Sequence, residues 1–263
     1  MSPPRILVTN DDGVESPGLH ALACALSRLG EVTVCAPEAE ESAVGHSITT
    51  RVPLRLKRVT LEGLERTYCV NGTPADSVKI ALGWLMTEGP PDLVVSGINL
   101  GPNTATNVIY SGTISAATEA RIMGVPSFAV SLGTYVNPHW ATAAGAAVQV
   151  ARTVLERGLP PRVLLNVNVP NRRPEQVRGM RLTRQGDSSF VDALEERLDP
   201  RGQPYYWLAG SYQMTDTDPT TDALALQDGW VSITPLSLDL TAHHAFSELS
   251  RWEWDEEGGQ TSP

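Results

Sequence analysis

The feature that most constrains the fold is a strand–helix–strand pattern in the first forty residues or so. Residues 6–9, Ile-Leu-Val-Thr, are apolar or β-branched, which is typical of a fully buried strand. A helix is predicted next, with Ser16 as its cap, Pro17 at its first position and Gly30 at its end. A second strand is predicted over residues 31–36. This order predicts a βαβ unit and therefore a parallel sheet.

The same alternation continues as far as Val169. Further helices are predicted over residues 73–86, 111–123 and 138–157, and further strands over residues 92–95, 126–131 and 162–167. Residues 96–110, which are rich in Gly and Asn, are predicted to be irregular. The alternation predicts an α/β fold with a doubly wound, mostly parallel sheet.

Beyond Pro170 the pattern changes to a β-rich extension. Residues 186–202 are charged and are predicted to be irregular, whereas strands are predicted at residues 205–208 and 230–234. The aromatic residues of this region are either ordinary core or contacts to a partner subunit. The predicted division is an α/β catalytic core over residues 1–184, a β-hairpin and C-terminal extension used in oligomerisation over 185–246, and an acidic, flexible tail over 247–263.

Composition limits the classes of partner. The formal net charge of -10 argues against a groove for duplex nucleic acid, although a bound cation can still adapt an acidic protein to a phosphate ester. Three cysteines, Cys24, Cys35 and Cys69, lie in apolar sequence and indicate a reducing, cytoplasmic environment. The N-terminus has no secretory leader, and the longest apolar stretch, residues 140–155, is too short to span a bilayer. We therefore expect a cytoplasmic protein with no membrane segment.

Three loops that follow predicted strands carry side chains with oxygen atoms. They contribute Asn10, Asp11 and Asp12 from the first loop, Ser42 from the second, and Ser96, Asn99 and Asn103 from the third. Loops at the carboxyl ends of parallel strands converge on one edge of the sheet. Their carboxylate, hydroxyl and amide oxygens suit Mg²⁺ or Mn²⁺, whereas no cluster of His and Cys suits zinc. Two adjacent carboxylates also need a compensating charge.

A helix start adds a possible anion site. Ser111, Gly112 and Thr113 open the helix, where backbone N–H groups and the helix dipole favour a phosphate, and Gly112 permits close approach. Simpler interpretations exist for each part: an ordinary Asn-Asp-Gly turn, a loop hydroxyl at Ser42, left-handed asparagines, and a helix cap at Ser111. The convergence of these residues on one sheet edge favours a site for a phosphoryl group.

With these residues in view, the chain resembles the SurE family of metal-dependent survival-protein nucleotidases. The resemblance rests on co-linear motifs at residues 8–13, 42–49, 71–76, 96–103 and 110–113, with further similarity at 166–170, 232–236 and 239–241. It implies a Rossmann-like core, an exchanged C-terminal segment, and homodimers or homotetramers. It also implies hydrolysis of nucleoside 5′- and 3′-monophosphates, and of short-chain polyphosphate, by a 5′-nucleotidase or acid phosphatase.

The resemblance also implies roles for individual residues. One divalent cation, Mg²⁺ or Mn²⁺, would be held by Asp11, Asp12, Ser42 and Asn99. The phosphate would be bound by Asn99, Asn103, Ser111, Gly112 and Thr113. The catalytic set would be Asp11, Asp12, Asn103 and Ser111.

In the mechanism that we expect, the cation positions a water and Asp11 or Asp12 helps to deprotonate it. Which of the two carboxylates does so is left open by the sequence. One alternative is a haloacid-dehalogenase-type phosphatase, but its two aspartates are separated by one residue, whereas Asp11 and Asp12 are adjacent. The other is a non-catalytic nucleotide-binding regulatory module. A dinucleotide site is disfavoured because no Gly-x-Gly-x-x-Gly follows the first strand.

Overall fold

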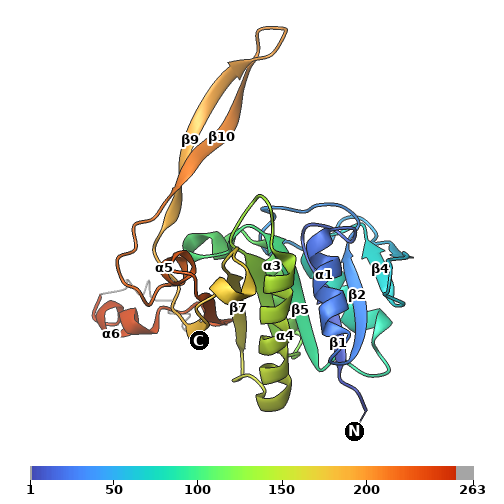
Figure 1. Ribbon diagram of the computed structural model, residues 1–263. Helices are drawn as coiled ribbons and strands as arrows, with labels where there is room; N and C mark the ends of the chain where they lie inside the picture. The colour runs from blue at the N-terminus through green and yellow to red at the C-terminus, as the bar shows by residue number, and fades with distance from the viewer. Residues whose placement is uncertain (1, 253–263) are drawn as a thin grey trace, which may run out of the picture.

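The computed structural model describes residues 2–252, and it confirms the predicted α/β fold with a doubly wound, mostly parallel sheet (Figure 1). The main sheet has the strand order β3-β4-β2-β1-β5-β6-β7-β11-β8. Neighbouring strands from β4 to β7 in this order run parallel, whereas β3 and β11 pair antiparallel to β4 and β7. Its strands are β1 (Arg5–Thr9), β2 (Glu31–Pro37), β3 (Leu56–Arg58), β4 (Thr67–Val70), β5 (Leu93–Leu100), β6 (Ser127–Leu132), β7 (Val163–Val169), β8 (Met180–Leu182) and β11 (Val231–Ser237).

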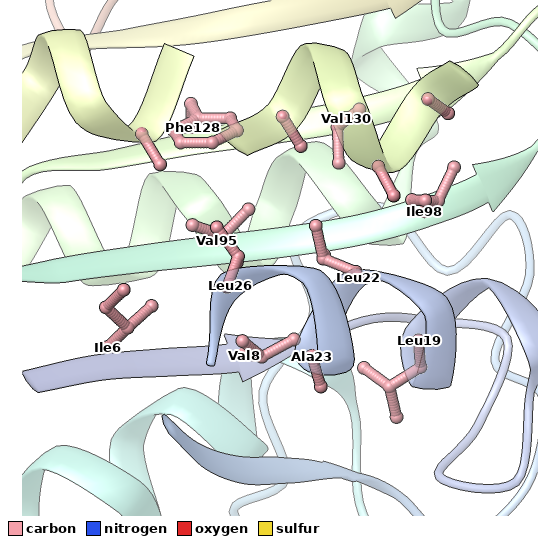
Figure 2. Close-up of a cluster of buried hydrophobic side chains, with 14 of the residues drawn as sticks. Ile6, Val8, Leu19, Leu22, Ala23, Leu26, Val95, Ile98, Phe128 and Val130 are labelled. Atoms are coloured by element: carbon pink, nitrogen blue, oxygen red, sulfur yellow. The ribbon is translucent and has the colours of Figure 1, made fainter. Parts of the chain in front are cut away.

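Helices cover both faces of the sheet. Apolar residues of the sheet form one core cluster with residues of α1 and α4, and a second cluster with residues of α2 and α3. In the first cluster, Ile6 and Val8 of β1 share the core with α1, with Val8 beside Ala23, and Phe128 of β6 lies beneath α4 (Figure 2). The helices are α1 (Pro17–Leu26), α2 (Pro74–Ile80) with a π-helical turn (Ala81–Leu85), α3 (Gly112–Ile122), α4 (Trp140–Arg157), α5 (Asp222–Gln227) and α6 (Phe246–Leu249), with 3-10 turns at Ala105–Ile109, Pro174–Gln176 and His243–Ala245.

The predicted helix starts are confirmed by side-chain caps. The Ser16 hydroxyl accepts a hydrogen bond from the Leu19 N–H at 3.2 Å, and Thr73 forms a capping box with Asp76. Each cap satisfies N–H groups that the first helical turn leaves without a backbone partner. No helix in the described part of the chain is long and apolar enough to cross a membrane.

The strand order creates a switch point at the carboxyl end of β1. The connection through α1 places β2 on one side of β1, whereas β5 pairs with the other side. Connections that leave β1 in opposite directions open a crevice at the carboxyl edge, which is where open α/β sheets bind ligands. The loops that follow β1, β2 and β5 meet at this position.

The prediction that residues 96–110 are irregular is wrong over much of that length. β5 continues to Leu100, because β6 supplies pairing partners, and the pairing only shifts register between Ser96 and Asn99. Gly97, with φ of +134°, accommodates this irregularity, as a residue without a Cβ can. Residues Ala105–Ile109 form a 3-10 turn. Sequence periodicity does not reveal a strand that contains a bulge.

The prediction that residues 186–202 are irregular is also wrong. β9 (Ser189–Leu198) pairs antiparallel with β10 (Pro204–Gln213), and this hairpin projects far from the body of the molecule (Figure 1). Its charged residues do not oppose strand formation, because a projecting hairpin has no buried face that would require an apolar alternation.

The chain beyond residue 184 also contributes to the main sheet. β11 pairs with β7 over six residues, and α5 begins at Asp222. The division into a core, an extension and a tail stays a prediction. Residues 253–263, most of the predicted flexible tail, lie outside the described residues.

Candidate active site

The turn after β1 places two carboxylates at the switch point. The Asn10 side-chain amide donates to the Gly13 carbonyl at 3.0 Å and to the Ser16 hydroxyl at 2.9 Å, which ties the turn to the cap of α1. Gly13 has φ of +95°, a conformation that favours glycine. Asp11 and Asp12 therefore lie in a turn with a defined shape, beyond the last residue of the strand.

Asp11 contacts the start of α3. Its carboxylate accepts a hydrogen bond from the Thr113 hydroxyl at 2.6 Å and another from the Thr113 backbone N–H, and the residue is only 5% exposed. A Cβ at Gly112 would lie 2.7 Å from the Asp11 Cβ, too close for any side chain. The glycine is therefore what permits the helix to approach Asp11, whereas close approach of a phosphate at Gly112 stays a prediction.

Asp12 is half-buried and lies against β5, where its carboxylate accepts a hydrogen bond from the Leu100 backbone N–H. Burial, together with the negative charges of the neighbouring Asp11 and Glu40, raises the pKa of Asp12 to about 7. Burial also raises the pKa of Asp11, against the hydrogen bonds from Thr113. Both carboxylates therefore resist ionisation, which is the signature of negative charge that lacks a nearby positive partner.

Glu40 is a third carboxylate that sequence reasoning missed. It raises the pKa of both aspartates, and its Oε1 accepts a hydrogen bond from the Ser42 hydroxyl at 2.6 Å. Ser42 is exposed, on the same loop after β2. Glu40 is the fourth residue after the strand predicted over residues 31–36, in the same loop as Ser42, and this position is a signal that points to it.

The loop that carries Ser42 is anchored to the helices behind the site. His46 Nε2 lies 2.8 Å from the buried Glu119 carboxylate of α3, and the Thr49 N–H donates to Asp76 of α2 at 3.0 Å. The Gly45 N–H donates to the Tyr110 carbonyl, immediately before Ser111. These contacts hold the loop beside the start of α3.

Asn99 reaches the site at the end of β5. Its amide nitrogen donates to the Gly101 carbonyl at 2.7 Å, which turns the amide oxygen away from that carbonyl. Asn99 pairs in register with Ser131 of β6, and its neighbour Leu100 is the residue that contacts Asp12. The structure thus brings Asn99 and Asp12 to the same part of the edge.

Asn103 is held by a buried network of amides that the sequence did not predict. Its N–H donates to Asn168 Oδ1 at 2.8 Å, and its carbonyl accepts from Asn166 Nδ2 at 2.7 Å and Asn168 Nδ2 at 3.0 Å. Its own amide nitrogen donates to the Ser131 hydroxyl at 2.9 Å. The signal was present in the sequence, because two asparagines at alternate positions of a buried strand lie on the same face and require partners.

The start of α3 combines two functions. The Ser111 hydroxyl accepts a hydrogen bond from the Ile114 N–H at 3.1 Å, so Ser111 is the helix cap. Thr113 holds Asp11 with both its hydroxyl and its N–H. The positive end of the helix dipole is thus directed at the carboxylates and at the space in front of them.

The oxygen donors at this edge fit a hard divalent cation. Within residues 2–252, no group of three or more His, Cys, Asp and Glu side chains is arranged to hold a metal ion. A cation here would therefore need the hydroxyl and amide oxygens of Ser42 and Asn99 beside the aspartates. The raised pKa values of Asp11 and Asp12 show that added positive charge would stabilise both.

The fold and this edge define a doubly wound α/β protein with an oxygen-lined, acidic site that faces a helix N-terminus. Comparison with known proteins identifies the family. The family model described as Survival protein SurE matches residues 6–192, and the chain belongs to the SurE family.

Relatives match over nearly the whole chain. A protein of Syntrophobacter fumaroxidans named 5′-nucleotidase SurE is 49% identical over 94% of this chain and 99% of its own length. A protein of Thermus thermophilus named 5′-nucleotidase SurE 1 is 50% identical over 94% of this chain and 96% of its own. The crystal structure of the SurE protein from Aquifex aeolicus is 40% identical, covers 94% of this chain and 99% of that one, and superposes with a TM-score of 0.83.

Proposed function

We propose that this protein is a metal-dependent phosphomonoesterase, a 5′-nucleotidase that converts nucleoside 5′- and 3′-monophosphates to nucleoside and phosphate. The observation that carries the proposal is the pair of adjacent carboxylates at the switch point, with Asp11 against the N-terminus of α3 and Asp12 against β5. The relatives named 5′-nucleotidase SurE, which match over 94% of the chain, support the same activity. Short-chain polyphosphate is a further substrate that we propose from the resemblance.

The side chains that would hold the cation are Asp11, Asp12, Ser42 and Asn99. When bound, Mg²⁺ or Mn²⁺ supplies a Lewis acid that polarises the phosphoryl group and lowers the pKa of a water. The site chemistry does not distinguish the two ions, since both favour oxygen ligands.

The remaining residues bind and orient the phosphate. Ser111 and Gly112 at the start of α3 would stabilise the negative charge that develops on the equatorial oxygens, with Asn99, Asn103 and Thr113 bordering the same space. Asp11 is already engaged by Thr113 and is nearly buried. We therefore assign to Asp12, the more accessible carboxylate, the role of accepting the proton of the attacking water.

Two other functions are less well supported. A haloacid-dehalogenase-type aspartyl-phosphate phosphatase requires a different spacing of its aspartates, and the relatives belong to another family. A regulatory nucleotide-binding module would use the same sheet edge without catalysis. The relatives named as nucleotidases favour catalysis over this alternative.

Phosphate release from a panel of nucleoside monophosphates, with and without chelator, tests the proposal. We expect hydrolysis that stops with chelator and returns with Mg²⁺ or Mn²⁺, and a loss of at least about a hundredfold in the Asp12→Asn variant. Asp228→Asn, at the exposed end of α5, is the matched control and should retain full activity. Hydrolysis that is insensitive to chelator, or full activity of Asp12→Asn, would refute the mechanism.

We also propose that the protein assembles as a homodimer or homotetramer in the cytoplasm. The hairpin β9–β10 exposes large apolar side chains, among them Leu208 at 79% and Trp207 at 57%. An isolated two-stranded hairpin is marginally stable in water, so contacts with a second copy would stabilise it. Three free cysteines, Cys24, Cys35 and Cys69, support a reducing compartment. Sedimentation of the wild-type protein and of a Leu208→Ser variant tests this assembly. We expect the variant to have a lower mass than the wild type, and equal masses would count against assembly through the hairpin.

A further inference from the structure

The backbone of Ala105 is held on both sides by residues from the far end of the chain. The Ala105 N–H donates to Asp222 Oδ2 at 2.9 Å, and the Ala105 carbonyl accepts from Gln185 Nε2 at 2.9 Å. Asp222 begins α5 and is completely buried. One peptide segment of the loop after β5 is thus fixed by two side chains more than seventy residues away.

Ala105 needs such support because of its conformation. Its φ of +51° lies in the left-handed region, which is unfavourable for an L-residue with a Cβ. Residues held in this region persist only where surrounding contacts determine the conformation. The pair of hydrogen bonds from Asp222 and Gln185 supplies that determination.

The fixed segment lies between two residues of the site. Asn103 precedes Ala105 by two residues, and the 3-10 turn that begins at Ala105 leads through Tyr110 to Ser111. A change in the Ala105 dihedral angles would rotate the chain between Asn103 and Ser111, so the two ends would no longer hold their present separation. The conformation of this one residue therefore affects the placement of both predicted phosphate contacts.

The Asp222 carboxylate also accepts hydrogen bonds from two other backbone N–H groups. Its Oδ1 accepts from the Gly186 N–H at 3.0 Å and from the Ala223 N–H at 2.8 Å, so both oxygens are used. An apolar side chain of the same size would leave the N–H groups of Ala105 and Gly186 without acceptors. The carboxylate thus joins the start of the hairpin region, α5 and the site segment at one point.

We propose that Asp222 is a positioning residue of the active site: it holds Ala105 in its left-handed conformation and so sets the position of Ser111 relative to Asn103, which the amides of Asn166 and Asn168 hold. The inference rests on the proposed phosphatase function and deepens it. It gives the C-terminal extension a direct role in assembling the site, separate from any role of the hairpin in oligomer formation.

The first test is Asp222→Asn. An asparagine has one oxygen, so its NH₂ group must face the N–H of Ala105 or that of Gly186. We expect kcat for a nucleoside monophosphate to fall about tenfold or more per folded molecule, with a smaller change in KM, because misplaced contacts act mainly in the transition state. Asp228→Asn, at the other end of the same helix, should leave both constants unchanged.

The second test separates positioning from general stability. Glycine adopts positive φ without the penalty of a Cβ, so Ala105→Gly in the Asp222→Asn background should restore kcat several-fold. A double-mutant cycle of kcat, with the folded fraction of each variant measured by thermal unfolding, quantifies this coupling. A role of Asp222 in stability alone predicts that Ala105→Gly leaves kcat per folded molecule unchanged in that background.

The possible outcomes differ clearly. Wild-type kcat in Asp222→Asn, or additive effects of the two substitutions, would overturn the inference while leaving the proposed function intact. A wild-type protein that hydrolyses no phosphate ester would instead refute the proposed function. Loss of kcat in Asp222→Asn together with its recovery in the double variant supports the positioning role.

Discussion

Substitution of Asp12 by Asn is expected to abolish catalysis and, in the metal-free protein, to raise stability. The physical reason lies in the raised pKa of Asp12: its carboxylate is half-buried near Asp11 and Glu40, so ionisation is unfavourable in the folded state. Asparagine keeps an oxygen to accept the hydrogen bond from the Leu100 N–H but carries no charge. A residue to which we assign a catalytic role therefore lowers the stability of the metal-free fold.

The magnitude follows from the pKa. A rise from the usual value of 3.8 to about 7 spans roughly three pKa units, each worth about 1.4 kcal/mol, or about 4 kcal/mol in a fully buried site. Asp12 is partly exposed, so solvent screening reduces this figure, and we expect about 2 kcal/mol.

The sign of the pH dependence follows from proton linkage. Between about pH 4 and pH 7, the folded state retains a proton at Asp12 that the unfolded state has already released. Stability of the wild-type protein therefore falls as pH rises through this window, and the penalty is complete above pH 7. Asp12→Asn lacks this contribution, so the advantage of the variant should be absent near pH 4 and largest near pH 8.

The assay is urea unfolding of both proteins with chelator at several pH values, followed by the same titration with Mg²⁺. We expect added Mg²⁺ to stabilise the wild-type protein much more than the variant, since cation binding favours the ionised carboxylate. An Asp12→Asn protein that is no more stable than the wild type at pH 8 in chelator would refute this account of the site's electrostatics.

Three further predictions concern the packing around the site. Gly112→Ala should lower kcat/KM more than tenfold, because the added Cβ would lie 2.7 Å from the Asp11 Cβ. The control is Gly145→Ala, on an open face of α4. This variant should be fully active, and its free energy of unfolding in urea should be about 0.5–1 kcal/mol higher than that of the wild type. Ser42→Ala should change the free energy of unfolding by less than about 0.5 kcal/mol, since Ser42 is exposed. It should nevertheless raise the Mg²⁺ concentration that gives half-maximal activity by about tenfold. An unchanged Mg²⁺ requirement would remove Ser42 from the ligand set. Asn168→Ala should cost about 1–3 kcal/mol of stability by leaving the buried Asn103 N–H without its acceptor, and equal stability by urea unfolding would contradict that network.

The sequence predicted the elements whose signals are local. Helix caps at Ser16, Thr73 and Ser111, and buried strands such as β1 and β6, depend on residues within a few positions of each other. The convergence of loops on one edge also followed, because parallel strands joined by helices permit little else.

Features that depend on distant partners could not be predicted. β5 continues past Gly97 only because β6 pairs with Asn99 and Leu100. The spacing of Asn166 and Asn168 indicates that their buried amides need partners, but only the structure shows that the backbone of Asn103 supplies them. Local patterns contain no information about a partner sixty residues away, so these parts of the site required the structure.

The adjacency of the two aspartates explains why the site lies where it does. Successive residues on a strand point to opposite faces, so Asp11 and Asp12 could not both face one ion while β1 continued. β1 ends at Thr9, and the turn closed by Gly13 removes that alternation. Glu40 raises the pKa of both Asp11 and Asp12, so both carboxyl groups lie close enough to interact with the same third carboxylate.

The switch point supplies the remaining requirement. Thr113 of α3 donates a hydrogen bond to Asp11, and the Leu100 N–H of β5 donates one to Asp12. Glu40, on the loop after β2, raises the pKa of both aspartates. These contacts come from different sides because β2 and β5 lie on opposite sides of β1. An α/β sheet offers such an arrangement where its winding reverses. We therefore expect the Asn-Asp-Asp-Gly turn to serve as a site at this strand, where the winding reverses, and not at a strand without a reversal.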